Sequence, residues 1–207
     1  MYHKTDEIKA FAKAGNFMKN TMILISGMPA TGKTTLAVWL SQKLRAPLVS
    51  YDRILEKLTR IKEKSAGSRK DHPDFSMIPY EFFLFEMEEI MRSSALFIAE
   101  YIFSSKMVNL LDPLSEKYGY QTINIHMNAA PKTAYRRFTE RNDQDAESKK
   151  IRPAISPEDF FEATKQNRDF LFGTHLIEVD AEDFSAISYE RIYEAVKKWM
   201  QESDSRI

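Results

Sequence analysis

The sequence of 207 residues contains no cysteine, which excludes disulfide bonds, thiolate metal sites and cysteine nucleophiles. Its longest apolar runs, such as 95–99, are far too short to span a lipid bilayer. Thirty basic residues balance thirty acidic ones, so no net charge draws the chain toward nucleic acid or an anionic membrane. The first residues are charged throughout and lack the apolar core of a secretory signal. We therefore expect a cytoplasmic protein with no membrane partner, for which nucleic acid is a disfavoured partner.

Histidine is also scarce, because the four histidines are scattered along the chain without the spacing of a metal site. Hydrophobic residues, by contrast, make up 43% of the sequence, which is ordinary for a globular protein. The length suffices for one domain with a substantial core and is marginal for two. We expect a single main domain that acts as a monomer or a homodimer.

Short apolar runs alternate with amphipathic segments along the chain. The runs predict strands at 22–26, 47–50, 95–99, 121–127 and 175–179. The segments predict helices at 33–45, 54–64, 80–93, 106–118, 131–141, 157–171 and 189–200, with a break or kink at Pro113. This order predicts an α/β fold in which a five-stranded parallel sheet lies between two helical layers. Residues 1–20, with a short helix at 6–14, are expected to form an N-terminal arm before the domain at 21–207.

Residues 27–34, Gly-Met-Pro-Ala-Thr-Gly-Lys-Thr, match the phosphate-binding pattern G-x-x-x-x-G-K-[ST] without a gap. A predicted strand precedes the pattern and a predicted helix follows it, as the motif requires. Glycines bring backbone N–H groups close to phosphate oxygens, Lys33 supplies a charge for the β- and γ-phosphates, and Thr34 offers a hydroxyl to Mg²⁺. The residues expected to bind the nucleoside triphosphate are Gly27, Met28, Pro29, Ala30, Thr31, Gly32, Lys33, Thr34 and Thr35.

A carboxylate, Asp52, follows the second predicted strand in LVSYDRI, residues 48–54. Ligands of parallel sheets bind outside the carboxyl ends of the strands, so Asp52 is expected to lie beside the phosphate loop. GMPATGKTTLA followed by LVSYDRI resembles the P-loop small-molecule kinases, in particular the group of chloramphenicol phosphotransferase, zeta-toxin and polynucleotide 5′-kinase. The resemblance implies that ATP and Mg²⁺ are the cofactors and that Lys33 and Asp52 are catalytic, with Asp52 accepting the proton of an acceptor hydroxyl. The alternative is that Asp52 only caps the following helix.

The resemblance extends to AYRRFTERN, residues 134–142, because these kinases carry an arginine-rich helix before a flexible lid. Arg137 and Arg141 are spaced one helical turn apart on one face, and the charged stretch 142–156 would form a mobile lid. The resemblance implies that both arginines act in catalysis over the triphosphate and that Arg137 also binds the nucleotide. A solvated basic helix, paired with acidic neighbours, is the alternative interpretation.

Glu100 directly follows the third predicted strand. A carboxylate at this place can hold a magnesium-bound water, which would make Thr34 and Glu100 the metal site, or it can contact the substrate. The similar kinases often carry aspartate at or near this place, so glutamate is a departure from their pattern. The end of a buried strand that happens to be acidic is the structural alternative.

The sequence thus predicts an enzyme, an ATP-dependent phosphotransferase that acts on a hydroxyl of a small molecule. Two other kinase functions stay open: phosphorylation of a sugar nucleotide, as in the zeta-toxins, and of a nucleic-acid 5′-hydroxyl, against which the zero net charge counts. The alternative that is not an enzyme is a nucleotide-dependent switch or binding module. The acceptor cannot be read from residues 53–93, where members of such families differ.

Overall fold

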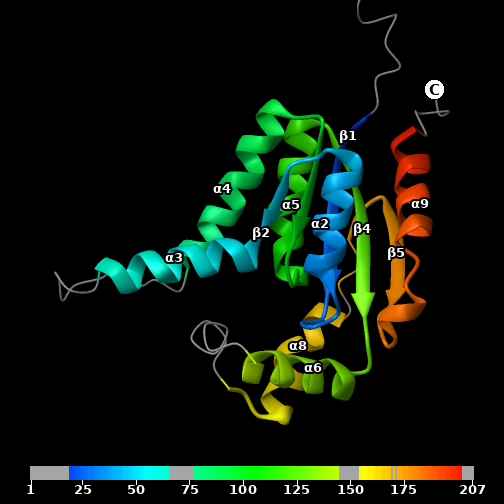
Figure 1. The fold of residues 1–207 in the computed structure, drawn as a ribbon. Coiled ribbons are helices and arrows are strands. Elements are labelled where there is room, and N and C mark those ends of the chain that lie inside the picture. Colours follow the sequence, from blue (N-terminus) through cyan, green and yellow to red (C-terminus); the bar gives the residue numbers. More distant parts are fainter. Residues whose placement is uncertain (1–18, 66–76, 145–153, 169, 171, 202–207) are drawn as a thin grey trace, which may run out of the picture.

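Five parallel strands form the centre of the computed structural model, in the order β2-β3-β1-β4-β5 (Figure 1). The strands are β1 (Asn20–Gly27), β2 (Leu48–Ser50), β3 (Leu96–Glu100), β4 (Tyr120–Asn128) and β5 (His175–Asp180). The structure describes residues 19–65, 77–144, 154–168, 170 and 172–201. The predicted α/β class with a five-stranded parallel sheet is confirmed.

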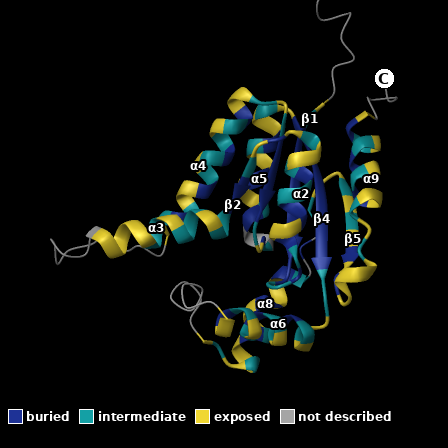
Figure 2. Ribbon diagram, viewed as in Figure 1, coloured by how far each residue is buried: buried dark blue, intermediate teal, exposed yellow. Residues whose placement is uncertain are grey.

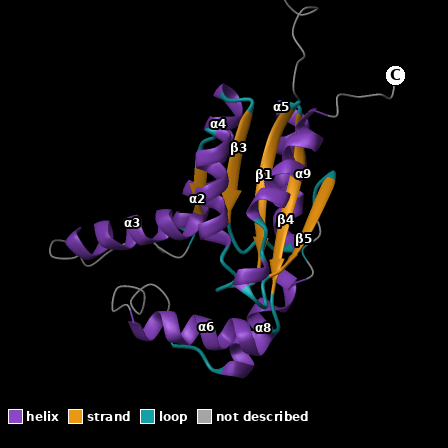
Figure 3. Cartoon of the chain, turned by 45° about the vertical axis from the view of Figure 1, so that its right-hand side comes forward, coloured by secondary structure: helices purple, strands orange, loops and turns teal. Residues whose placement is uncertain are grey.

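Helices cover both faces of this sheet, which makes three layers (Figures 1 and 3). The helices that cover it are α2 (Lys33–Leu44) and α9 (Tyr189–Gln201) on one face, and α4 (Ile78–Ser93) and α5 (Ser105–Tyr118) on the other. Helix α3 (Tyr51–Ser65) runs outward from the end of β2 (Figure 1). Side chains of β1 alternate between the two layers, as the period of a strand requires. Ile23 and Ile25 pack with α2 and α9. Met22 and Leu24 pack with α4 and α5, so β1 is buried on both faces (Figure 2).

Two boundaries differ from the prediction in an informative way. Helix α3 begins at Tyr51 rather than at residue 54, because Tyr51 already packs its ring against Phe83 and Tyr101. Helix α5 continues through Pro113, where the loss of one N–H donor does not outweigh the packing of its buried side. The predicted helix at 6–14 lies outside the described residues. None of the described helices combines the length and apolar composition that a transmembrane span requires.

A second helical unit, α6 (Pro131–Gln144) and α8 (Pro157–Arg168), lies beyond the carboxyl ends of the strands (Figure 1). Phe138 of α6 and Phe160 of α8 pack around Met28 of the β1–α2 loop. Asn167 donates a hydrogen bond of 3.0 Å to the carbonyl oxygen of Phe103, which ties the end of α8 to the loop after β3. The predicted lid at 142–156 begins within α6, and its part from 145 to 153 lies outside the described residues.

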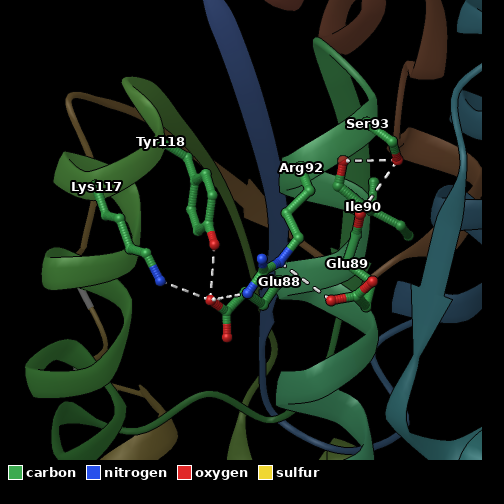
Figure 4. A network of polar contacts seen from close by, with 7 residues as sticks. All are labelled: Glu88, Glu89, Ile90, Arg92, Ser93, Lys117 and Tyr118. Carbon is green, nitrogen blue, oxygen red and sulfur yellow. Dashed lines mark hydrogen bonds and ion pairs between the residues drawn. The ribbon is translucent and has the colours of Figure 1, made fainter.

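Glu88 links α4 to α5 through a group of polar contacts (Figure 4). One carboxylate oxygen, Oε1, accepts hydrogen bonds from Lys117 Nζ at 2.9 Å and from Tyr118 Oη at 2.7 Å. Arg92 Nη2 of the same helix lies 3.1 Å from this oxygen. The hydrogen bonds from Lys117 and Tyr118 lower the pKa of Glu88 from 4.5 to about 2.

We predict that Glu88→Gln lowers the stability of the protein at neutral pH and that this difference from wild type shrinks in acid. A carboxyl whose pKa is lower in the folded than in the unfolded state stabilises the fold at pH values above the unfolded pKa. This contribution is lost as the pH falls from about 4.5 toward about 2. Urea unfolding midpoints across this range measure the effect. Glu89→Gln, on the neighbouring exposed position, is the matched control, and equal pH profiles for the two variants would contradict the prediction.

Candidate active site

The β1–α2 loop has the backbone geometry of a phosphate cradle. Gly27 has a φ of 113°, and a Cβ at this position would overlap the carbonyl oxygen of Met127, so the loop passes too close to β4 for any side chain. Gly32, with a φ of 86°, is the N-cap of α2. The first N–H groups and the positive end of the dipole of α2 therefore face the loop, where they favour an anion.

Lys33, the first residue of α2, is held against this loop with only 6% of its surface exposed. Its Nζ donates a hydrogen bond of 2.6 Å to the carbonyl oxygen of Met28, which also accepts one of 2.8 Å from Thr31 Oγ1. The ammonium group and the loop N–H groups thus lie on the same concave stretch of chain. This is the arrangement that the sequence motif predicts for binding phosphate oxygens.

A cavity of about 270 Å³ opens beside the phosphate loop and brings together residues that are far apart in the sequence. Asp52 lies in the first turn of α3, directly after β2, and lines the cavity, as the position of a strand end predicts. The other lining residues are Pro29, Ala30, Gly32, Lys33, Thr34, Thr35, Tyr51, Leu55, Glu100, Tyr101, Ile102, Phe138 and Arg141. Of the predicted catalytic residues, the cavity therefore unites Lys33, Asp52 and Arg141.

Glu100 forms the floor of this cavity at the end of β3 and is 3% exposed. Its Oε2 accepts a hydrogen bond of 2.7 Å from Ser50 Oγ, and its carboxylate is also hydrogen-bonded to the hydroxyl of Thr34. Burial raises the pKa of Glu100 above its ordinary value, and the neighbouring Asp52 adds to the increase. The positive charge of Lys33 acts in the opposite direction.

Thr34 and Glu100 offer hard oxygen donors at one place, which fits Mg²⁺. Within the described parts of the chain, no group of three or more histidine, cysteine, aspartate or glutamate residues could hold a metal ion by itself. Magnesium differs from metals that need such a cage, because it commonly takes one or two protein ligands together with phosphate oxygens and water. These two residues could therefore hold Mg²⁺ only together with a bound nucleotide.

The two arginines predicted to act together lie in different surroundings. Arg141 is one of the residues that line the cavity. Arg137, one turn earlier on α6, donates hydrogen bonds of 2.6 Å to the carbonyl oxygens of Ala181 and Glu182. Its guanidinium carbon also lies 3.9 Å from the centre of the Phe184 ring. The structure thus brings only Arg141 of this pair into the cavity, and Arg137 lies at the loop after β5.

Phe184 is a candidate site residue that the sequence analysis missed. It opens a short 3₁₀ helix, η1 (Phe184–Ala186), and 49% of its surface is exposed. Its ring lies 3.4 Å from where a Cβ on Gly32 would be. Asp183 caps η1 by accepting a hydrogen bond of 2.9 Å from the backbone of Ser185. This Asp-Phe-Ser turn after the last strand is the signal that could have identified the residue.

The fold and the site together define a nucleotide-binding protein of the P-loop class. Residues 23–164 match the profile of the family described as AAA domain, and the chain belongs to this family. The match runs from β1 into α8 and includes every residue that lines the cavity, whereas Phe184 and its loop lie outside the match. The narrower resemblance to the chloramphenicol phosphotransferase, zeta-toxin and polynucleotide 5′-kinase group stays a prediction.

Solved structures share the fold at low sequence identity. A protein from Chloroflexus aurantiacus, provisionally described as a kinase, is 23% identical with a TM-score of 0.72, over 87% of this chain and 98% of its own. Shikimate kinase from Bacteroides thetaiotaomicron is 14% identical with a TM-score of 0.52, over 87% and 98%. A gluconokinase from Sinorhizobium meliloti is 13% identical with a TM-score of 0.50, over 89% and 93%. No curated protein sequence matches the chain.

Proposed function

We propose that the protein is an ATP-dependent phosphotransferase that moves the γ-phosphate of ATP to a hydroxyl group of a small molecule. The observation that carries this proposal is the single cavity lined by Lys33, Asp52 and Arg141. These residues supply a phosphate-binding cation, a carboxylate that can accept a proton, and a second cation in the same cavity. Phosphoryl transfer depends on such positioning and charge neutralisation more than on covalent chemistry.

The reaction assigns one task to each of these residues. Lys33 and the loop N–H groups bind the β- and γ-phosphates, where Mg²⁺, held by Thr34 and Glu100, neutralises phosphate charge when it is bound. Asp52 orients the acceptor hydroxyl and takes its proton while the hydroxyl oxygen forms a bond to the γ-phosphorus. The bond between the γ-phosphorus and the bridging oxygen breaks, and ADP leaves with the electron pair. Arg141 stabilises the negative charge on the group in transfer.

Arg137 has a different task in this proposal, on the nucleoside side of the site. The planar guanidinium and the exposed ring of Phe184 lie stacked beside Gly32, where the phosphate loop joins α2. Planar cations and aromatic rings provide the faces on which a purine base stacks. Arg137 would thus contribute to ATP binding, which agrees with the nucleotide role expected for it from the sequence.

The packing of α6 over the loop favours transfer to an acceptor over hydrolysis. Phe138 lines the cavity, and together with Phe160 it buries Met28 of the phosphate loop. An apolar cover of this kind keeps water away from the transferred group. A binding module or switch would need the phosphate loop but not a further carboxylate and a further cation that line the same cavity.

We expect Lys33→Ala to abolish the thermal stabilisation of the protein by Mg-ATP. A ligand at 100 times its Kd stabilises by about 2.7 kcal/mol, which for a chain of this size is a shift in Tm of roughly 5 to 10 °C. Differential scanning fluorimetry with and without Mg-ATP measures this shift. Lys43→Ala is the matched control, because Lys43 lies on the same helix and pairs with Glu190 on the surface. An unchanged shift in Lys33→Ala would remove the phosphate-binding role.

The function itself is tested by ADP release from Mg-ATP in the presence of candidate acceptors. The panel contains nucleosides, sugars, sugar nucleotides, aromatic alcohols and 5′-hydroxyl oligonucleotides. ADP release that depends on one small-molecule acceptor, with the phosphate recovered on its hydroxyl, is the expected result. Release that yields only inorganic phosphate at the same rate with every acceptor would contradict the proposal.

A further inference from the structure

Part of the lining of the cavity is an apolar and aromatic wall. This wall consists of Tyr51, Leu55, Tyr101 and Ile102. The rings of Tyr51 and Tyr101 lie with their centres only 4.1 Å apart. Because Asp52 directly follows Tyr51 in α3 and lines the same cavity, this wall adjoins the carboxylate that the proposed reaction uses. An acceptor that presents its hydroxyl to Asp52 must therefore lie against these side chains.

Buried aromatic residues support the wall from behind. Tyr101 packs against Phe83 and Phe103, with ring centres 5.5 and 5.7 Å away, and both phenylalanines are fully buried. The hydroxyls of Tyr51 and Tyr101 are hydrogen-bonded to each other. Burial holds the pKa of Tyr101 well above its usual range, so this hydroxyl stays neutral. The wall is thus a rigid, uncharged surface.

The charges around the cavity disfavour an acceptor that carries a negative charge. Among the described lining residues, Asp52 and Glu100 are acidic, whereas Lys33 and Arg141 are basic. Both cations are assigned to the phosphates of ATP in the proposed reaction. Within the described part of the lining, no further cation would lie beside an anionic acceptor next to Asp52 and the γ-phosphate, and uncompensated like charges at close range are unfavourable.

Two basic residues near the start of α3 lie on a different side of the helix from the active-site cavity. Arg53 and Lys57 line a separate cavity of about 340 Å³ between α3 and α4. Leu55, between them in the sequence, occupies the wall of the active site instead. The helix therefore presents an apolar side chain to the cavity of the active site, whereas Arg53 and Lys57 face the separate cavity.

The size of the cavity limits the acceptor further. Its volume of about 270 Å³ includes the space beside the phosphate loop. Ligand pockets usually measure about 300–1,000 Å³, so this cavity is slightly smaller than the usual range. A small molecule fits such a volume, whereas a polynucleotide would have to leave most of its length outside.

From this wall, its charges and its volume, we propose that the phosphate acceptor is a small uncharged alcohol with an aromatic or apolar face, which packs against Tyr51 and Tyr101. This inference rests on the phosphotransferase function proposed above and specifies its substrate class. It favours neutral alcohols over sugar nucleotides and nucleic-acid ends.

Matched pairs of acceptors that differ by one negative charge test the inference. One pair is 4-methylbenzyl alcohol and 4-(hydroxymethyl)benzoate, and a second is glucose and glucuronate. Saturation-transfer NMR with a non-hydrolysable ATP analogue measures binding, and ADP release measures transfer. We expect the neutral member of the aromatic pair to bind at least about tenfold more tightly than its carboxylate counterpart. Tighter binding of the anionic members, or no binding of either aromatic compound, would overturn the inference.

A charge placed on the wall should reverse this selectivity. Leu55→Arg puts a cation where α3 faces the acceptor, and we expect the preference to move toward the anionic members by about tenfold or more. Leu55→Gln, which adds a polar group without charge, is the matched comparison and should not favour the anions. Arg53→Ala, in the separate cavity, should leave the preference unchanged. An unaltered preference in Leu55→Arg would show that the acceptor does not lie on this wall.

The two proposals fail in different ways. If the neutral aromatic alcohol binds preferentially but no phosphate is transferred to any acceptor, the phosphotransferase function is contradicted and the assignment of the wall stands. If phosphate is transferred mainly to anionic acceptors, the function stands and the acceptor class is wrong.

Discussion

Replacing Arg141 with alanine is expected to lower kcat by about 10³-fold or more while ATP still binds. Arg141 lines the cavity from α6, and the packing of α6 on Met28 uses other side chains of this helix. A cation at this place acts mainly on the charge that develops during transfer, so its loss affects turnover more than binding. Steady-state ADP release with saturating Mg-ATP and acceptor measures kcat, and the thermal shift with Mg-ATP reports binding.

Two other arginines of the same helix serve as comparisons. Arg136 is exposed and pairs with Glu140 at 3.0 Å, so Arg136→Ala should leave kcat unchanged. Arg137 contacts the loop after β5, so Arg137→Ala should mainly raise KM for ATP. If Arg141→Ala kept near-normal turnover, Arg141 would be a surface residue. If Arg137→Ala lost as much kcat as Arg141→Ala, the transfer role that the sequence predicts for both would hold.

Asp52→Asn is expected to reduce phosphate transfer by about 10² to 10⁴-fold with little change in the Mg-ATP thermal shift. The amide keeps the size of the side chain in the first turn of α3 and still accepts a hydrogen bond from the acceptor hydroxyl. It cannot accept the proton that this hydroxyl loses as its oxygen bonds to the γ-phosphorus. ADP release, followed together with acceptor binding by NMR, separates the loss of proton transfer from a loss of binding.

Glu56→Gln provides the control for this change of charge. Glu56 lies one turn further along α3 and forms a surface ion pair with Arg60, outside the cavity. Its replacement removes the same charge from the same helix, so transfer should stay within about twofold of wild type. Full activity in Asp52→Asn would contradict the role as a base and leave Asp52 as a residue of the helix start.

The phosphate loop, Asp52 and Glu100 could be located from the sequence because each follows a buried parallel strand. Such strands are short continuous apolar runs, and their carboxyl ends meet at one edge of the sheet. Local pattern and topology therefore agree at these positions. The structure places all three around one cavity, while their chemical roles stay predictions.

The surroundings of Arg137 and Arg141 could not be read in the same way. Helical spacing predicts that the two side chains share a face, but it does not say which part of the chain lies opposite each turn. Arg137 contacts the loop after β5, which is distant in sequence, whereas Arg141 lines the cavity. The aromatic wall could not be predicted for a related reason. Residues such as Tyr51 and Tyr101 are of types that usually lie in a core, and they line a cavity only because the start of α3 and the end of β3 come together.

Met28 belongs to the phosphate loop and also packs with the helices beyond the sheet. It occupies a variable position of the nucleotide-binding pattern, yet its side chain is fully buried with Phe138 and Phe160 of the helices outside the sheet. A displacement of α6 therefore repacks a residue of the loop itself, and a change in the loop repacks α6. If the packing of these helices on Met28 affects phosphate binding, phosphate binding must affect that packing by the same free energy. Met28 is therefore a side chain through which the donor site and the two helices beyond the sheet are in direct contact.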